Sequence, residues 1–568
     1  MASISSTGVA SGIDWNSLIS AILQQEGQPV QRLQDQQTAN NNRLTALQRL
    51  QSDMNALSSS ATALGGSAFD ARTVTSSDTN NTYVTATATG AAVGSYDLQV
   101  SQVATAGKIS PTLSGGLPTN LAVADPLATQ VFSGSSASFA IQGTDGVIRT
   151  LTLGSANNNL YGLRDAINAL STPDPNVPGS KGLGVTATVV NTGSGANPYQ
   201  LVLTSNTTGT GTTGGVATLA DVTSGGAVNT LGIAAGTVDS MTAPTTISGG
   251  LTSSGASVAQ DAQFSINGVQ LTRKTNAVTD AVDGVTFNLK QGGQTGTTTL
   301  TVGVDKSSIT SAMQDVISKF NSLLSDYKSA SATGGALYND STTRSFISQI
   351  RSALTGVPAG LSTTATFNST ASLGIKTNQD GTLSLDTTAF QSALDKDPAA
   401  AKRIFANSGV STSAAVAFYG AGSNTATGAI GFNITSYVSG GAVSGTFTVG
   451  GNNYTLSGTN GSLVGTAGTP LEGLILGVTG VGSGTLTVSR GVSQATQDAV
   501  SSITNYGSGM LTRIISSIND QNRTLVNQIT VGQARLDRRK ILLQAQFAQV
   551  ESVIGQLQAA GQSISGMA

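Results

Sequence analysis

The stretch from residue 511 to 560 constrains the fold of this chain more than any other. Apolar residues recur along it mostly at steps of three, four or seven, which places them on one face of a helix. They are Leu511, Ile514, Ile515, Ile518, Leu525, Ile529, Leu536, Leu543, Phe547, Val550, Ile554 and Leu557. From Leu536 onward the spacing is that of a coiled-coil seam. No proline interrupts the stretch, and a continuous helix would be about 75 Å long at 1.5 Å per residue. Gly532 is a point at which it could break or bend.

A helix with such an apolar face needs a partner, and the other end of the chain offers one. Asp14 stands where an N-cap belongs, before the apolar residues Leu18, Ile22 and Leu23. Pro29 suits the first turn of a helix that restarts there. That second helix is predicted to continue to the pair Gly65-Gly66 through the apolar residues Val30, Leu33, Leu44, Leu47, Leu50, Met54, Leu57, Ala61 and Leu64.

Between Leu33 and Leu44 the same pattern is almost purely polar and rich in Gln and Asn. Apolar ends around a polar centre predict a weak helix that orders mainly on assembly. Both termini are therefore expected to be helical and to pack. Packing between subunits is favoured over a hairpin within one chain, although both stay open.

Composition excludes several classes of function. The chain has 568 residues, enough for several domains, with 10% charged residues and a net charge of −2. No electrostatic case exists for binding nucleic acid or an anionic membrane. Cysteine and histidine are both absent from the sequence, which excludes disulfides and thiol catalysis and removes the commonest general base and metal ligand. The 69 glycines, with abundant Ser and Thr, favour β-structure with many tight turns.

The first residues show neither the basic segment nor the apolar core of a Sec signal peptide. No apolar run approaches the roughly 20 residues that a membrane span needs. The composition is nevertheless that of a surface protein. We therefore expect either a cytoplasmic protein or a dedicated export route that reads an uncleaved N-terminus.

The predicted fold is multidomain α+β, with a terminal helical coiled coil, a layer containing a helical bundle, and inserted β-rich domains. One inserted unit reads β-β-α-β-β: a hairpin over 138–153 that turns at Asp145-Gly146, a helix over 160–170, and strands over 185–190 and 199–204. The predicted domains are a terminal coiled coil of 1–43 with 530–568, a helical layer of 44–75 with 295–410 and 492–529, a β-rich domain of 76–110 with 236–294, an inserted α+β domain of 111–235, and an extra β-rich insert of 411–491.

The chemical motifs in the chain are weak. Lys376 to Gly381 superficially resembles a calcium loop, but lysine cannot bind calcium at the first ligand position, so a hairpin turn is favoured. Residues 480–484 lack the third glycine of a dinucleotide loop. Scattered carboxylates permit a glycosidase-type pair in principle. No catalytic, cofactor-binding or metal-ligating set emerges, and we expect a protein that is not an enzyme and has no cofactor.

Arg535, Arg538, Arg539 and Lys540 form the one basic cluster of the sequence, on the predicted C-terminal helix. A solvated coiled-coil face is the favoured interpretation. Ion pairs between subunits are the alternative.

Several stretches resemble one family. The opening Ser11-Gly12-Ile13-Asp14, followed by Leu18, Glu26 and Pro29, is similar to the N-terminal signature of the bacterial flagellar filament cap family, hook-associated protein 2. Further stretches similar to that family, in the same order, are 94–104, 283–289, Leu373-Gly374-Ile375 with 380–386, and the tail from Arg535-Leu536 through Phe547, Val550-Glu551 and 554–557. Residues 111–260 and 411–491 match it only in character.

The resemblance implies a structural protein at the distal tip of the flagellar filament, needed for filament elongation and motility. It would leave the cell through the flagellar type III apparatus with a chaperone bound, form a homo-oligomeric ring, expected to be a pentamer, and help exported flagellin to fold and insert. Other implied partners are the hook–filament junction proteins and, for an adhesive role, host mucin or glycans. The residues expected to carry assembly are Leu18, Ile22, Leu33, Leu536, Leu543, Phe547, Val550, Ile554 and Leu557.

Two alternatives stay open at this point. Another axial flagellar protein, a flagellin or a junction protein, would share terminal helices and β inserts, but a flagellin would form long filaments rather than closed rings. A surface adhesin built on the Thr- and Gly-rich β domains would bind glycans without needing the terminal helices.

Overall fold

The computed structural model describes residues 12–109, 121–132, 134, 136–142, 147–171, 182–210, 218–221, 237–238, 247–248, 258–362 and 364–565. The turn predicted at Asp145-Gly146 and the residue Ser11 of the opening motif lie outside these ranges. The chain divides into two compact units, Met1–Phe69 with Lys306–Ala568 and Asp70–Asp305.

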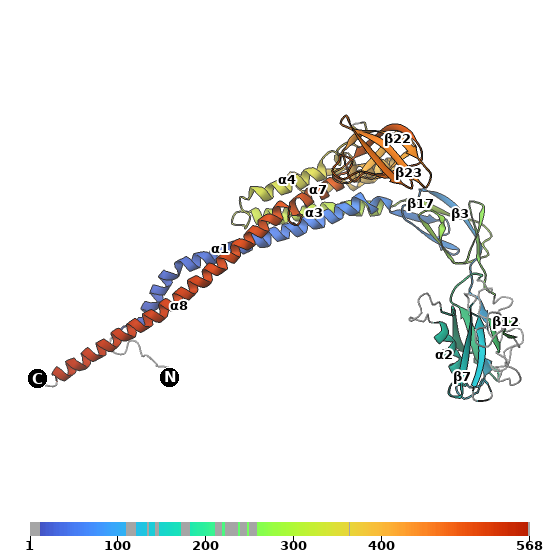
Figure 1. Ribbon diagram of the computed structural model, residues 1–568, viewed down its shortest axis with the longest axis horizontal. Helices are drawn as coiled ribbons and strands as arrows, with labels where there is room; N and C mark the ends of the chain where they lie inside the picture. The colour runs from blue at the N-terminus through green and yellow to red at the C-terminus, as the bar shows by residue number, and fades with distance from the viewer. Residues whose placement is uncertain are drawn as a thin grey trace. The chain divides into compact units, whose positions relative to one another are not determined.

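The first unit is built on two long antiparallel helices, one from each end of the chain (Figure 1). They are α1 (Trp15–Gly65) and α8 (Met510–Ser565). The remaining helices of this unit are α3 (Lys306–Ser331), α4 (Ser341–Thr355), α5 (Thr387–Lys396), α6 (Pro398–Phe405) and α7 (Val492–Thr504). The predicted pairing of the two termini is confirmed, because α1 packs along α8. It forms within one chain, which is the alternative that the sequence favoured less, and packing between subunits stays a prediction.

The start and end of α1 are as the sequence predicts. Asp14 is the N-cap, and its Oδ1 atom accepts hydrogen bonds from the amides of Asn16 and Ser17, each at 3.1 Å. The hydrogen bonds from the Ser17 hydroxyl and then the Ser17 amide hold the pKa of Asp14 below its usual value. At the other end the Gly66 amide donates to the Thr62 carbonyl, which closes the last turn.

Two expectations about breaks in the long helices are wrong. The predicted restart at Pro29 does not occur, because α1 is one helix with Pro29 inside it. A proline removes one backbone hydrogen bond, and the helix bends rather than ends where packing holds both sides. Figure 1 shows the N-terminal part of α1 bowing away from α8 and returning. Gly532 does not interrupt α8 either.

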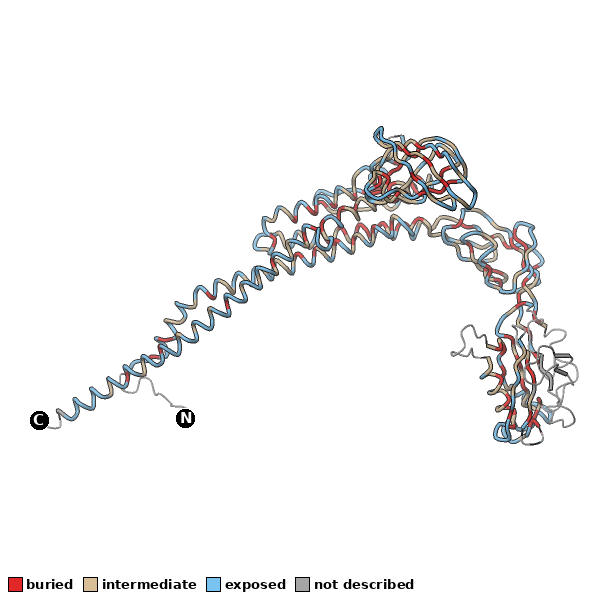
Figure 2. Tube along the Cα trace, in the orientation of Figure 1, coloured by how far each residue is buried: buried red, intermediate tan, exposed pale blue. Residues whose placement is uncertain are grey.

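The second half of α1 is the core of a helical layer. It packs against α3, α7 and α8, and Figure 2 shows buried positions more densely here than along the outer half of the α1–α8 pair. The buried α1 side chains in this layer are Leu47, Leu50, Met54, Leu57, Ala61 and Leu64. The hairpin of β18 (Ile375–Thr377) and β19 (Leu383–Leu385) lies beside α3. Its Asp380-Gly381 turn is confirmed, with the Asp380 carboxylate accepting from the Thr382 amide at 3.0 Å.

The insert between α6 and α7 is an eight-stranded antiparallel sheet in the order β20-β27-β22-β23-β24-β25-β26-β21. Its strands are β20 (Ser408–Ser411), β21 (Val416–Gly420), β22 (Gly428–Tyr437), β23 (Ala442–Val449), β24 (Asn452–Thr459), β25 (Ser462–Val464), β26 (Ile475–Val478) and β27 (Gly482–Ser489). The two ends of this order, β20 and β21, also lie against each other, so the sheet curls into a barrel around an apolar core. The apolar pattern of the sequence predicts five strands in this insert, over 432–437, 445–449, 454–456, 474–478 and 484–488, and it misses β20, β21 and β25.

The second unit contains two smaller sheets near its chain ends. One has the order β1-β17-β3-β13-β14 and the other β15-β16-β2. The strands are β1 (Arg72–Ser76), β2 (Val84–Ala88), β3 (Gly94–Gln102), β13 (Ala262–Ile266), β14 (Val269–Arg273), β15 (Ala277–Val282), β16 (Val285–Leu289) and β17 (Thr298–Val304). The pair Asn267-Gly268 interrupts the apolar pattern of 264–271 and so predicts a hairpin turn from the sequence. It joins β13 to β14, and both residues have positive φ, 49° and 82°.

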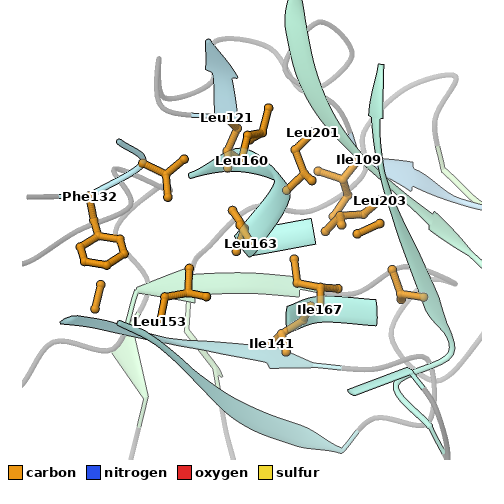
Figure 3. Packing of buried hydrophobic residues seen from close by; sticks show 14 of the residues in the cluster. Ile109, Leu121, Phe132, Ile141, Leu153, Leu160, Leu163, Ile167, Leu201 and Leu203 are labelled. Atoms are coloured by element: carbon orange, nitrogen blue, oxygen red, sulfur yellow. The ribbon is translucent and has the colours of Figure 1, made fainter. Parts of the chain in front are cut away.

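The β-β-α-β-β unit is confirmed. Its elements are β6 (Ser136–Gln142), β7 (Ile148–Gly154), α2 (Leu160–Ser171), β8 (Val185–Asn191) and β9 (Tyr199–Ser205), with the short strands β4 (Lys108–Ile109), β5 (Ala122–Val123), β10 (Thr218–Asp221), β11 (Thr237–Val238) and β12 (Ile247–Ser248) around them. Figure 3 shows its core, in which Leu160, Leu163 and Ile167 of α2 point toward side chains from the strands.

Candidate assembly surface on the terminal helices

The described part of the chain holds no group of three or more Asp, Glu, His or Cys side chains that could bind a metal ion. Among the described helices, none is both long and apolar enough to cross a membrane. The feature that stands out is a surface, the outer half of the α1–α8 pair. We call this outer half, residues 12–42 with 520–565, the terminal hairpin.

Trp15 anchors the far end of the terminal hairpin. Its ring stacks on Phe547 of α8 with centroids 4.7 Å apart and planes 20° from parallel. Its Nε1 donates a hydrogen bond to Oε2 of Glu551 at 2.8 Å. Both Trp15 and Glu551 are only 8% exposed. The contact therefore combines aromatic packing with a charge-assisted hydrogen bond, and it fixes the register of the two helices.

Three further contacts continue this register along the terminal hairpin. Glu26 pairs with Arg539, with 3.2 Å between Oε1 and Nε. A Cβ at Gly532 would lie 2.7 Å from a methyl of Val30, so only glycine lets the helices approach this closely. In the polar centre, Nδ2 of Asn522 donates to Oδ1 of Asn41 at 2.7 Å. Such amide layers in a helix pair favour one register at some cost in stability.

The nine predicted assembly residues fall into three groups. Leu543 is buried; Ile22, Leu33, Leu536, Phe547 and Ile554 are half-buried; Leu18, Val550 and Leu557 are exposed. The structure brings Phe547 against Trp15, and it places Leu536 beside Gly27, with Cδ1 of Leu536 3.6 Å from where a Cβ on Gly27 would lie. That these residues carry assembly stays a prediction.

The two exposed members on α8 are uncovered for different reasons. The seam Phe547, Val550, Ile554 and Leu557 keeps coiled-coil spacing, but α1 begins at Trp15, opposite Phe547 and Glu551. Val550 lies between these two residues in sequence and is still 43% exposed, so it faces away from α1, whereas Leu557 lies beyond the start of α1 and is 66% exposed. Other large apolar side chains exposed on the terminal hairpin are Ile13, Val526, Val531, Ile541, Leu542 and Val553.

Sequence reasoning missed Trp15 as a site residue. A single aromatic residue at the start of a helix adds little to a periodic pattern. The one available signal was its uniqueness, since Trp15 is the only tryptophan of the chain, and tryptophan is a frequent anchor at interfaces.

Where the terminal hairpin joins the helical layer, two ion pairs link α1 to the other helices. Arg43 contacts Asp340 at 2.9 Å and Arg49 contacts Asp326 at 2.6 Å. Next to the second pair, burial and then the neighbouring Asp326 carboxylate raise the pKa of Asp53 to about 6, against the opposing effects of Arg49 and Lys319.

Comparison with known proteins finds matches along most of the chain. The model of the flagellar hook-associated protein 2 C-terminus matches residues 259–559, and that of the flagellar hook-associated protein 2 N-terminus matches residues 11–107. The B-type flagellar hook-associated protein 2 of Pseudomonas aeruginosa is 31% identical over 69% of this chain and 78% of its own length. Flagellar hook-associated protein 2 of Escherichia coli K12 is 28% identical over 77% of this chain and 85% of its own length.

Among solved structures, the D1-D2-D3 domains of the flagellar cap protein FliD from Escherichia coli align with 63% of this chain and 89% of that one, at 28% identity and a TM-score of 0.47. FliD from Pseudomonas aeruginosa aligns with 42% of this chain and 93% of that one, at 28% identity and a TM-score of 0.29. Residues 108–258 lie between the two family-model matches.

Proposed function

Since this chain belongs to the flagellar hook-associated protein 2 family, the flagellar cap proteins, we propose that its terminal hairpin holds the cap on the filament through the apolar seam that α1 leaves uncovered. The protein caps the flagellar filament and serves flagellum assembly and motility. Its family is structural rather than enzymatic, and we propose no catalytic role for it.

One observation carries the proposal about the seam. Val550 faces away from α1 and is 43% exposed, and Leu557 lies beyond the last contact of α8 with α1 and is 66% exposed. The two residues are seven apart, so they share one face of α8. A stripe of this kind in water is an unpaired half of a helical interface. Copies of this chain in a ring, expected to be a pentamer, and the axial proteins below the cap are the proposed partners that cover it.

The contacts of α1 support the proposed domain division. As far as residue 42, α1 contacts α8 through Trp15, Glu26 and Asn41, whereas from Arg43 on it also contacts α3 and the start of α4. We therefore propose a terminal coiled coil of 1–43 with 530–568 and a helical layer of 44–75 with 295–410 and 492–529. The proposed β-rich domains are 76–110 with 236–294, 111–235 and 411–491.

The finer parts of the function are proposals as well. We propose that the protein is exported by the flagellar type III system with a chaperone, that it meets the hook–filament junction proteins first, and that it then shelters flagellin subunits as they insert. Absence of cysteine suits passage of an unfolded chain through a narrow channel without cross-linking. Adhesion to host mucin or glycans is proposed only as a secondary activity of the β domains.

The test replaces the exposed seam in the full-length chain. Val550→Asp with Leu557→Asp should abolish rings in electron micrographs and light scattering, and should fail to restore filaments in bacteria lacking the cap. The matched control is Val438→Asp with Val481→Asp, two valines of the barrel that are 56% and 63% exposed. Circular dichroism of both proteins verifies that they are folded. A seam variant that still forms rings and caps filaments would refute the proposal.

A further inference from the structure

A groove in the terminal hairpin has features that the uncovered seam does not explain. It lies between α1 and α8, at residues 532–542 of α8, and encloses about 720 Å³. Its apolar lining includes Val30, Leu33, Leu536 and Leu542, and its basic rim includes Arg535 and Arg538. We call it the basic groove.

Local sequence explains why the helices leave this space. Pro29 lies in the groove lining and deprives one carbonyl of α1 of its amide donor, which favours a local bend. On either side, contacts hold the helices together: Val30 approaches Gly532, and Glu26 pairs with Arg539. The groove is therefore framed by specific contacts.

The charges at the groove are unbalanced. Residues 535–540 carry four cations and the single carboxylate of Asp537, in a chain with only 10% charged residues. Arg539 is engaged by Glu26. Arg535 and Arg538 are exposed, and neither makes an ion pair with any residue that the structure describes. Two unpaired guanidinium groups beside an apolar cleft suit a ligand with both carboxylates and apolar side chains.

The terminal segments of a second copy do not fit this description. Residues 1–25 and 541–568 contain only two carboxylates, Asp14 and Glu551. Asp14 caps α1, and Glu551 is buried against Trp15. In a ring of rotationally related copies, the same residues stand at the same height, which brings the basic clusters of neighbours to one level. These observations favour a different protein over a second copy of this chain as the ligand of the basic groove.

We propose that the basic groove binds an acidic amphipathic helix of a partner protein. Apolar side chains of that helix pack on Leu33, Leu536 and Leu542, and its carboxylates pair with Arg535 and Arg538. This deepens the proposed function and rests on it, since the partner is a protein met during export or at the filament tip. The groove assigns that partner a chemistry: a helix with one apolar face bordered by Asp or Glu.

Binding to synthetic peptides tests this directly. The probe is a fluorescent 21-residue helical peptide with Leu along one face and Glu at most other positions. Its counterpart replaces every Glu with Lys. Anisotropy is measured on the full-length chain, on Arg535→Glu with Arg538→Glu, and on Leu542→Asp. The matched control is Arg523→Glu, a charge reversal on the same helix outside the groove lining, where Arg523 pairs with Asp520 at 2.9 Å.

The acidic peptide should bind the full-length chain, and its affinity should fall as the salt concentration is raised. Both groove variants should bind it at least tenfold more weakly, whereas Arg523→Glu should bind it as the parent does. Equal binding of the Lys peptide, or an unchanged affinity after the double reversal, would overturn the proposal. So would binding to phosphatidylglycerol vesicles without binding to the peptide, because a membrane would then be the ligand. The double-reversal variant keeps the seam at Val550 and Leu557 intact, so it should still form rings while it loses the peptide. This result tests the groove separately from the proposed function, which depends on the seam.

Discussion

The pair of carboxylates between α1 and α3 yields a prediction with a calculable size. Asp53 faces Asp326, and its Oδ2 atom is shut off from solvent and accepts no hydrogen bond from a described residue. The pKa of Asp53 is raised from 3.8 to about 6. Because the folded-state pKa lies above the unfolded value, the folded chain binds the proton more tightly. The resulting stability is present in full below the unfolded value and is lost as the pH rises through about 6.

The magnitude follows from the shift. Roughly two pKa units correspond to an upper limit of about 3 kcal/mol at about 1.36 kcal/mol per unit. Partial exposure and screening by salt reduce this to about 1 kcal/mol. Asp53→Asn removes the charge with little change of shape, so it should stabilise the α1–α3 contact by about 1 kcal/mol at pH 7.5 and by almost nothing at pH 4.

Hydrogen exchange measured by mass spectrometry on peptides from residues 47–57 is the appropriate assay, because global unfolding of a multidomain chain is not two-state. Comparing variant and parent at the same pH cancels the intrinsic exchange rate. In Asp53→Asn the protection of these backbone amides against exchange should rise about fivefold at pH 7.5. Asp326→Asn should gain less, since it also breaks the 2.6 Å pair with Arg49, and the surface control Asp520→Asn should leave these peptides unchanged. A destabilised Asp53→Asn, or an effect equal at both pH values, would refute the reasoning.

Two further predictions concern the terminal hairpin, and the fluorescence of Trp15, the sole tryptophan, reports on changes where α1 and α8 pack together. Gly561→Ala adds a Cβ where no atom of the described residues lies within 4 Å; it should stabilise α8 by about 0.5–1 kcal/mol, measured as helicity by circular dichroism in urea. Gly532→Ala should instead destabilise the hairpin in urea, because its Cβ would lie 2.7 Å from Val30; an equal gain from both would show that the close approach is absent. Phe547→Ala removes the ring stacked on Trp15 and should shift tryptophan emission to the red and weaken the hairpin by about 1–2 kcal/mol, whereas Leu557→Ala, 66% exposed, should leave the emission unchanged.

Periodicity explains which parts of the fold the sequence could predict. The apolar stripes of α1 and α8, the small β-β-α-β-β unit and the turns at Asn267-Gly268 and Asp380-Gly381 depend on local spacing and local turn chemistry, and all are confirmed. The continuity of α1 through Pro29 could not be predicted in this way, because packing against α8 on both sides outweighs the local cost of a proline.

The missed parts of the site and of the barrel share a cause. Trp15 and Glu551 are far apart in sequence and meet only after the two ends of the chain have paired. In the barrel, β20 and β25 have only three or four residues, and Gly409 packs its backbone against Phe418 rather than supplying an apolar side chain. Such strands are defined by their neighbours across the sheet. Whether the nine predicted residues carry assembly is a question for the seam variants.

The way the barrel is attached has a consequence for the history of this chain. It enters through β20 and leaves through β27, which are hydrogen-bonded neighbours, and the hydroxyls of Ser408 and Ser489 are 2.7 Å apart. At the base, Gly491 donates to Asn407, and Arg490 reaches the loop carbonyls of Ser423 and Thr425. A segment whose two ends meet can be gained, lost or exchanged for another without displacing α6 and α7. The position after Asn407 is thus a domain-insertion site. A different domain could be displayed there on a flagellar cap, through evolution or by engineering.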